Sequence, residues 1–349
     1  MIKKPTAKFP SELRLDLVSQ DWVVIATGRG KKPEMFKTET RKESRVSARD
    51  CPFCRIETQE KPILIYRRGE RMNHSGAQIP PDWTTVLIPN KYPAFLPQPQ
   101  IEKATEGNLY QRMNAVGFHE LVITRDHHKS LALLSPDQIG EVLTLYQERY
   151  LQLMKNDFVS YVSIFHNHGR EAGASQPHPH SQIITTPLLD VDLRAALSSS
   201  ESYFKEKGKC VYCQMLKWER RVKTRLVFEN RDFVVICPFA SKAAFEMIIS
   251  PKRHLPYFEK INRAEREQLA EAFQEALGRL HKALNDPAYN FYLHTAPCDG
   301  RKYDHYHWHW TILPKTATWA GFEIGTRIEI STLEPEKAAE YLRTFSAEP

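Results

Sequence analysis

The sequence predicts an α+β fold made of two copies of one unit, each a mainly antiparallel sheet with a packed helix. Three observations predict it. The chain has 349 residues, which is roughly two domains at about 150 residues each. A Cys-x-x-Cys motif occurs at Cys51 and Cys54 and again at Cys210 and Cys213. The same order of strands, helix and histidines follows each motif, as expected of an internal repeat.

The elements of the first copy follow from local residue patterns. Short runs rich in apolar and β-branched residues between turn residues predict strands, and apolar residues at helical spacing predict a helix. Ser135 is a candidate N-cap, and Pro136 is a candidate first helical residue. The predicted elements are, in order, strands over 84–89 and 120–124, a helix over about 136–155, and a strand over 159–165.

The second copy repeats this order, with Asn262 opening its helix. Its predicted elements are strands over 233–237 and 246–250, a helix over 262–284, and a strand over 289–294. The distance from an isolated histidine to a His-x-His pair is 51 residues in the first copy and 53 in the second. Two unrelated segments would rarely agree so well.

Three segments lie outside this repeated order. Residues 187–209 are predicted to be a connector, because a serine run lies within a charged, helix-compatible stretch. An N-terminal appendage contains a strand-like segment over 22–26. The stretch 36–49 is so polar that we expect a mobile loop there.

The composition is that of a soluble globular protein, with 41% apolar and 26% charged residues. No apolar run approaches the roughly 20 residues that span a bilayer, and no apolar stretch follows the basic N-terminus as in a secretory signal. A cytoplasmic location is therefore expected. The net charge of +7 suits a phosphate-bearing ligand but is too small to require nucleic acid.

Each copy offers two thiolates and two imidazoles, the ligand set of a closed tetrahedral zinc site. Two occurrences of the same set favour zinc over a redox pair or buried thiols. His128 is next to His127 and competes with it as a ligand. Because protein would fill all four positions, we expect two structural zinc ions. The two sets are Cys51, Cys54, His127 and His178, and Cys210, Cys213, His254 and His307.

The second histidine of the first His-x-His pair, His180, is left over for chemistry. Residues two apart share a face of a strand, so it is expected beside the predicted ligand His178. A neutral imidazole is a competent nucleophile towards phosphorus, and the amide of Gln182 can donate to a phosphoryl oxygen. The backbone of the small-residue loop with Gly173 and Ser175 suits a diphosphate. The second copy lacks this loop and the glutamine, so we expect His309 to be structural or a dimer contact.

These motifs resemble the galactose-1-phosphate uridylyltransferase family of the histidine-triad superfamily, including its branch similar to ADP-sugar phosphorylases. The family pattern of Asn, Gly-x-Ser and His-Pro-His-x-Gln is matched by Asn167, Gly173, Ser175, His178, His180 and Gln182. The resemblance implies two histidine-triad-like repeats, over 1–188 and 195–349. It further implies a nucleotidyltransferase of galactose metabolism with ping-pong kinetics. His180 would attack a nucleotide sugar, release hexose 1-phosphate and leave a nucleotidyl-histidine for a second hexose 1-phosphate.

The resemblance also implies further substrate contacts and an assembly. Asn90 stands where the nucleobase pocket of the family lies. Arg29 and Lys32 match basic positions that help to bind the nucleotide across a subunit boundary, and Glu323 matches an acceptor for sugar hydroxyls. The implied assembly is a homodimer.

Other readings stay open at this point. Ser181 and Lys91 stand where the best-known uridylyltransferases resemble Gly and Asp. The loop over 318–323 keeps the Gly-aromatic-Glu of the family but lacks the Lys-Phe that precedes it, so the base and the sugar are both open. An ADP-sugar phosphorylase or adenylyltransferase with phosphate as acceptor is one alternative, and a dinucleotide phosphorylase or hydrolase is another. A distant alternative is a non-enzymatic nucleic-acid-binding protein that is stabilised by zinc. It is distant because aromatic residues do not alternate with Lys and Arg, as a groove that stacks bases requires. The expected partners are a nucleotide sugar and hexose 1-phosphate, without nucleic acid or membrane.

Overall fold

One large sheet forms the centre of the protein. The computed structural model describes residues 11–27, 31–39, 47–73 and 79–347. Within them, eleven strands are ordered β11-β12-β13-β15-β14-β9-β10-β8-β5-β3-β4. The strands of the first half are β3 (Leu64–Arg67), β4 (Glu70–Arg71), β5 (Thr85–Pro89), β8 (His119–Thr124), β9 (Tyr161–His168) and β10 (His180–Thr186). Those of the second are β11 (Leu226–Glu229), β12 (Phe233–Ile236), β13 (Met247–Pro251), β14 (Tyr289–His294) and β15 (His309–Pro314).

The two halves of the sheet have the same strand order. Reading outward from the centre, it is β9-β10-β8-β5-β3 on one side and β14-β15-β13-β12-β11 on the other. The central strands β9 and β14 pair antiparallel, with Asn167 opposite Asn290, and the other neighbours are antiparallel too. The predicted α+β fold is confirmed. Because both halves form one sheet, the domain boundaries 1–188 and 195–349 stay a proposal.

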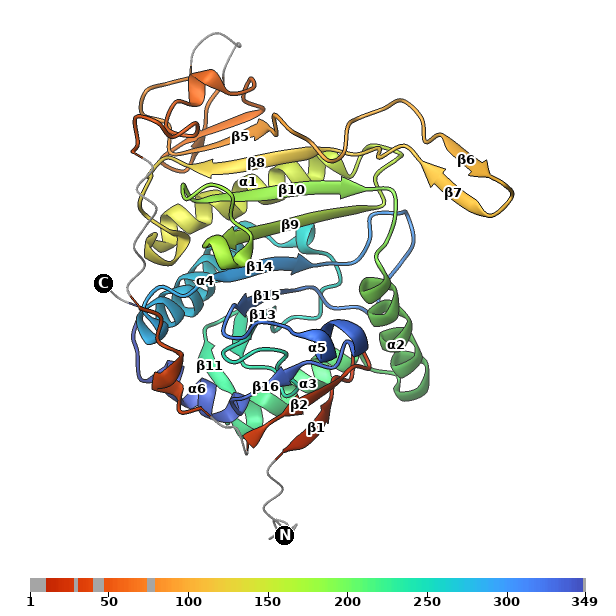
Figure 1. Cartoon of the computed structure of the whole chain (residues 1–349), viewed down its shortest axis with the longest axis vertical. Coiled ribbons are helices and arrows are strands. Elements are labelled where there is room, and N and C mark those ends of the chain that lie inside the picture. The colour runs from red at the N-terminus through yellow and green to blue at the C-terminus, as the bar shows by residue number, and fades with distance from the viewer. Residues whose placement is uncertain (1–10, 28–30, 40–46, 74–78, 348–349) are drawn as a thin grey trace.

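The predicted helix of each copy covers the same face of the sheet. These helices, α1 (Pro136–Leu153) and α4 (Arg263–Leu284), contact each other and lie behind the sheet in Figure 1. Both begin with a capping box, in which the N-cap side chain and the third helical residue bond reciprocally. The N-caps are Ser135 and Asn262, as the sequence predicts. The strand ends differ from the predictions by at most a few residues.

The alternation along the strands decides which residues face the helices. Ile183, Ile164 and Trp310 are fully buried in the core between the sheet and the helices. Successive side chains of a strand point to opposite faces. In β10, the odd-numbered Ile183 faces the helices. His180 and Gln182 have even numbers, so they lie on the face away from α1 and α4.

Several elements surround this centre. The other helices are α2 (Val191–Lys207), α3 (Val211–Val222), α5 (Gly321–Thr326) and α6 (Pro335–Arg343). A three-stranded sheet contains β1 (Glu12–Leu15), β2 (Trp22–Ile25) and β16 (Ile330–Ser331), and a hairpin contains β6 (Lys103–Glu106) and β7 (Tyr110–Met113). The hairpin projects from the body of the molecule (Figure 1). Among the described residues, we find no helix both long and apolar enough to cross a membrane.

The structure bears on two expectations about the connecting segments, agreeing with the first and correcting the second. The predicted connector contains α2, which is capped by the side chain of Asp190 and followed by Gly208 in the left-handed conformation. The expected mobile loop over 36–49 begins at Phe36, which is buried with its ring against that of Phe245, so its first residue was placed wrongly. Residues 40–46 of that segment lie outside the described residues.

Candidate active site and paired metal centres

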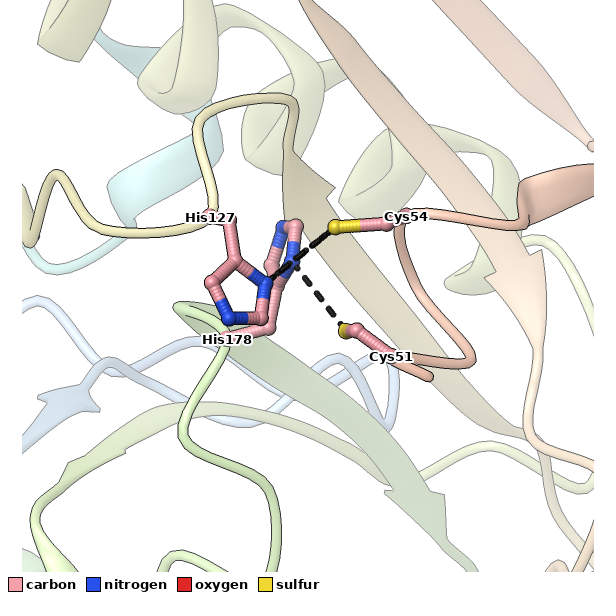
Figure 2. Close-up of side chains that lie close together, drawn as sticks. All are labelled: Cys51, Cys54, His127 and His178. Atoms are coloured by element: carbon pink, nitrogen blue, oxygen red, sulfur yellow. Dashed lines mark hydrogen bonds between the residues drawn. The ribbon is translucent and has the colours of Figure 1, made fainter. Parts of the chain in front are cut away.

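Four side chains of the first repeat converge on one point (Figure 2). Their ligand atoms, two sulfurs and two ring nitrogens, lie within 4.8 Å of one another. Cys51 and Cys54 precede β3, His127 follows β8, and His178 precedes β10. The Nδ1 atom of His127 lies 3.2 Å from Cys54 Sγ and 3.2 Å from His178 Nδ1. The group contains His127 rather than its neighbour His128, and the convergence is that of ligands around one ion.

A backbone carbonyl fixes how His178 faces this point. Its Nε2 lies 2.7 Å from the carbonyl oxygen of Thr124, so Nε2 carries the proton and donates it. The Nδ1 lone pair therefore points towards the sulfurs of Cys51 and Cys54, each 3.5 Å away. Such an outer partner is typical of histidines that bind metal. Burial lowers the pKa of His178 to about 4, which keeps the ring neutral, as ligation requires.

The second repeat builds an equivalent group. Cys210 is the N-cap of α3 and Cys213 lies in its first turn. The ligand atoms of this pair and of His254 and His307 lie within 4.8 Å of one another. The Nε2 atoms of both histidines again donate to backbone carbonyl oxygens, at 2.8 and 2.9 Å. All eight predicted ligands are thus brought together in two groups that fit a tetrahedral ion.

His180, the predicted nucleophile, lies at the start of β10 and is only 7% exposed. Its Nδ1 is 2.9 Å from the carbonyl oxygen of His178, so Nδ1 carries the proton and Nε2 has the free lone pair. The ring of Phe53 packs against it at 5.0 Å between centroids. Burial lowers the pKa of His180, and the hydrogen bond to His178 only partly opposes this. The ring is therefore neutral, with one nucleophilic nitrogen.

The small-residue loop is attached to the sheet beside His180. Asn290 of β14 donates from Nδ2 to Asn167 Oδ1 at 2.7 Å and to the carbonyl oxygen of Ala172 at 2.8 Å. Asn167 therefore accepts through its oxygen, and its amide nitrogen is turned towards Gly173, where an added Cβ would lie 3.8 Å away. Asn290 lies on a predicted strand, but its contact depends on pairing between the repeats, so sequence reasoning missed it.

Some backbone N–H groups of this loop are already used in hydrogen bonds within the loop, and others are not. The N–H of Gly173 donates to the carbonyl oxygen of Arg170, and that of Ala174 donates to the carbonyl oxygen of Gly169. Within the described residues, the N–H of Ser175 donates to no acceptor, and the residue is exposed. Of the small-residue amides, the loop therefore offers that of Ser175 to a ligand. Gly173 has a φ of +88°, a conformation that favours glycine.

A cavity of about 560 Å³ lies on the open face of the sheet. Its lining includes Phe165 and Asn167 of the first repeat and Tyr292 and His309 of the second. The register Ser181–His166 between β10 and β9 places Asn167 beside His180 at the next position. The cavity therefore begins next to the candidate nucleophile and continues along the open face of the strands of the second repeat.

Two predicted residues lie close together at the other end of this face. Gln182 shares the open face with His180, and its Oε1 is 2.8 Å from His119 Nε2. Asn90 follows β5, and its Nδ2 is 3.0 Å from the same His119 nitrogen. His119 was not anticipated, although it directly precedes the predicted strand over 120–124. Asn90, the expected base contact, and Gln182, the expected phosphate donor, thus both contact the imidazole of His119.

Ser181 lies on the opposite face, so it cannot contact a substrate on the open face. It is 2% exposed, and its hydroxyl lies 2.5 Å from Tyr146 Oη and 3.0 Å from His166 Nδ1. Its departure from the family glycine therefore concerns core packing.

The remaining predicted contacts lie elsewhere in the chain. Lys32 is exposed and precedes the short helix Pro33–Phe36, which packs against α4 and α6. Glu323 lies in α5, and its carboxylate accepts from the backbone N–H of Ala320 at 3.0 Å. Arg29 lies outside the described residues. Their roles in substrate binding stay predictions, and those of Arg29 and Lys32 involve a second subunit.

Two family models together match almost the whole chain. The N-terminal domain of galactose-1-phosphate uridyl transferase matches residues 3–190, and its C-terminal domain matches residues 196–348. The chain belongs to this family. The predicted resemblance and the predicted class, a nucleotidyltransferase acting on sugar nucleotides, are thereby confirmed.

Relatives within the family carry two different names. The ADP-glucose phosphorylase of Arabidopsis thaliana is 31% identical over 339 residues, covering 96% of this chain and 93% of its own length. The galactose-1-phosphate uridylyltransferase of Thermotoga maritima is 27% identical, covering 97% and 99%. The solved A. thaliana ADP-glucose phosphorylase with bound ADP-glucose matches with a TM-score of 0.77 at 30% identity, covering 96% and 99%. A solved uridylyltransferase matches with 0.72 at 26% identity, covering 95% and 97%.

Proposed function

We propose that this member of the galactose-1-phosphate uridyl transferase family moves a nucleotidyl group from a nucleotide sugar to hexose 1-phosphate through His180. The observation that carries the proposal is the hydrogen bond from His180 Nδ1 to the His178 carbonyl, which leaves Nε2 as a neutral nucleophile. Nε2 attacks the α-phosphorus, the bond to the bridging oxygen breaks, and hexose 1-phosphate leaves. A phosphate oxygen of the acceptor then attacks the same phosphorus, and the phosphorus–nitrogen bond breaks.

Groups around His180 supply donors for the phosphoryl oxygens. The amide nitrogens of Gln182 and Asn167 both face the open side, because the oxygen of each amide is engaged. The free backbone N–H of Ser175 adds a third donor. Donors aimed at developing negative charge stabilise the transition state more than the bound substrate. Asn90 would contact the nucleobase.

We further propose that the substrate site is completed in a homodimer. The family resemblance implies that Arg29 and Lys32 help to bind the nucleotide across a subunit boundary, which a homodimer would supply. Light scattering at micromolar concentration tests this, with a monomer as the contrary result.

We propose zinc for both Cys₂His₂ groups, at two ions per chain. The sets fit because they combine thiolates with neutral imidazoles held by backbone carbonyls. When bound, zinc supplies a structural cross-link rather than a reactive group, since all four ligands come from protein. In the first repeat, the same residue would serve both: the side chain of His178 would bind the zinc ion, and its carbonyl oxygen accepts the hydrogen bond from His180.

A second acceptor is favoured by one comparison. The relative that is 31% identical across nearly the whole chain is an ADP-glucose phosphorylase. In that variant of the function, ADP-glucose forms the same covalent intermediate, and inorganic phosphate replaces hexose 1-phosphate in the second step. The compartment, expected to be the cytoplasm, stays a prediction.

Intact-protein mass spectrometry under denaturing conditions tests the proposal. The protein is mixed with UDP-glucose or with ADP-glucose, and peptide mapping locates any adduct. We expect a nucleotidyl adduct at His180 with the preferred donor and none in His180→Ala. Addition of galactose 1-phosphate or of phosphate should remove the adduct and identify the acceptor. Turnover without an adduct would establish direct displacement and refute the covalent role of His180.

A further inference from the structure

His119 connects two residues that we assign to the substrate. It begins β8, beside β10, and its Nε2 lies 2.8 Å from Gln182 Oε1 and 3.0 Å from Asn90 Nδ2. Its other ring nitrogen, Nδ1, is 3.1 Å from the backbone nitrogen of Ala94. The imidazole therefore lies between the segment after β5 and the strand that carries His180.

The contact with Ala94 determines where the proton of His119 lies. A backbone N–H can only donate, so Nδ1 accepts from Ala94 and has no proton. A neutral imidazole then carries its proton on Nε2. Gln182 Oε1 is the acceptor at hydrogen-bond distance from that nitrogen, whereas the Asn90 amide nitrogen is itself a donor and cannot compete for the proton.

This arrangement sets the orientation of two amides. Because Gln182 accepts through its oxygen, its amide nitrogen points away from His119 and makes no hydrogen bond within the described part of the chain. The oxygen of Asn90 is engaged by the backbone N–H of Tyr92 at 2.9 Å. Both amides therefore keep N–H groups for another acceptor.

We propose that His119 is a positioning residue whose Nε2–H tautomer holds the Gln182 amide with its nitrogen towards the phosphoryl group. The inference rests on the proposed function, because it concerns a donor to the same phosphorus. With the amide reversed, a carbonyl oxygen would face the anionic phosphoryl oxygens, and a hydrogen bond would be replaced by repulsion.

A merely structural role for the ring would be to attach the segment after β5 to β8. The backbone already does this. Asn90 N–H donates to the His119 carbonyl oxygen at 2.9 Å, and β5 and β8 pair over five residue positions. The side-chain contact with Gln182 is therefore separate from the strand pairing, and it can be removed without breaking that pairing.

The first test measures the tautomer directly, without substrate. Long-range ¹H–¹⁵N correlation on the full chain labelled at histidine reports which ring nitrogen carries the proton, and His119→Leu assigns the signal. We expect an unprotonated Nδ1 and a protonated Nε2. A proton on Nδ1 would overturn the inference. This result stands even if no nucleotide sugar reacts, in which case only the proposed function fails.

The second test asks whether His119 acts through Gln182. Single-turnover rates of adduct formation are measured for His119→Leu, His119→Gln, Gln182→Ala and the double variant His119→Leu/Gln182→Ala. We expect His119→Leu to slow the step about 10-fold at saturating donor, as loss of an aligned transition-state donor does. His119→Gln should keep most of the rate, since its amide can donate to Gln182. The double variant should match Gln182→Ala within about 2-fold, because both changes remove one interaction.

A matched control loosens the same segment without touching the ring. Asn114 bonds the backbone of Gln100 and Glu102 at the base of the projecting hairpin, and Asn114→Ala should leave the rate of adduct formation unchanged. A wild-type rate in His119→Leu, or a full further loss when that change is added to Gln182→Ala, would overturn the inference.

Discussion

Glu246 is a buried carboxyl group whose ionisation should control part of the pH dependence of stability. It directly precedes β13 and is 6% exposed. Burial raises its pKa from 4.5 to about 7, and nearby Asp16 adds to the increase. The backbone N–H of Lys242, 2.5 Å from Glu246 Oε2, and the charge of Lys242 oppose it. The folded protein therefore binds this proton more tightly than the unfolded chain does.

The size of the effect follows from linkage. The contribution of a group with a raised folded-state pKa is fully present below the unfolded value of 4.5 and is lost as the pH rises through about 7. A difference of about 2.5 pKa units corresponds to about 3 kcal/mol of unfolding free energy. An unfolding entropy of roughly 2 cal/mol/K per residue converts this, for 349 residues, into about 4 °C of melting temperature.

Thermal melting of Glu246→Gln at pH 5 and pH 8 tests this reasoning. The glutamine cannot ionise, yet its oxygen can still accept from the Lys242 N–H. We expect the variant to melt within about 1 °C of the wild type at pH 5 and about 4 °C higher at pH 8. Glu340→Gln, on the exposed side of α6, is the control and should show no such difference. The reasoning is refuted if Glu246→Gln melts no higher than the wild type at pH 8.

Three further predictions concern stability. Elemental analysis should find two zinc ions per chain. A chelator should lower the melting temperature strongly, because structural zinc contributes on the order of 10 kcal/mol to folding. A count of one ion would refute the second zinc site, and a count of none would refute both. Gly117→Ala should cost about 2 kcal/mol or more in chemical denaturation, since an added Cβ would lie 2.2 Å from the carbonyl oxygen of Thr185; an unchanged midpoint would contradict it. Ser181→Gly should cost about 1–3 kcal/mol by leaving buried polar groups of Tyr146 and His166 without a partner, while the rate ratio for UDP-glucose and ADP-glucose stays the same; a changed ratio would contradict it.

What could be predicted from the sequence were the features with a local signal. The caps of α1 and α4 depend on residues three positions apart, and the sequence shows them directly. The two Cys₂His₂ groups are not local, but their fixed order occurs twice, and that repetition made them recognisable. The family motif then singled out His180 and Gln182 among the residues of the open face.

The features that were missed have no such signal. Every residue of β6 and β7 is exposed, so that hairpin has no alternation between apolar and polar positions. Asn290 reaches the loop of the first repeat only because β9 and β14 pair. His119 contacts Gln182 across neighbouring strands whose register the sequence does not specify. In each case the information lies in pairing between distant segments.

The comparison of the two repeats gives a last prediction, about His309. Its Nδ1 lies 3.2 Å from the His307 carbonyl oxygen, which repeats the anchoring of His180. The residue opposite differs: β14 and β15 place His294 across from His309, with the rings stacked at 4.7 Å, where the first repeat has the amide of Asn167. Two positions beyond His309 stands Thr311, where the first repeat has Gln182, so this imidazole lacks the amide donor that would stabilise charge on a phosphoryl group.

We therefore expect His309→Ala to keep the covalent adduct at His180, at a rate within a few-fold of the wild type. Its partner experiment, His180→Ala, should yield no adduct at either histidine, as read by peptide mapping after incubation with each nucleotide sugar. An adduct at His309 in that variant would show that the second repeat has kept its own chemistry, and that anchoring of the ring alone is sufficient for the reaction.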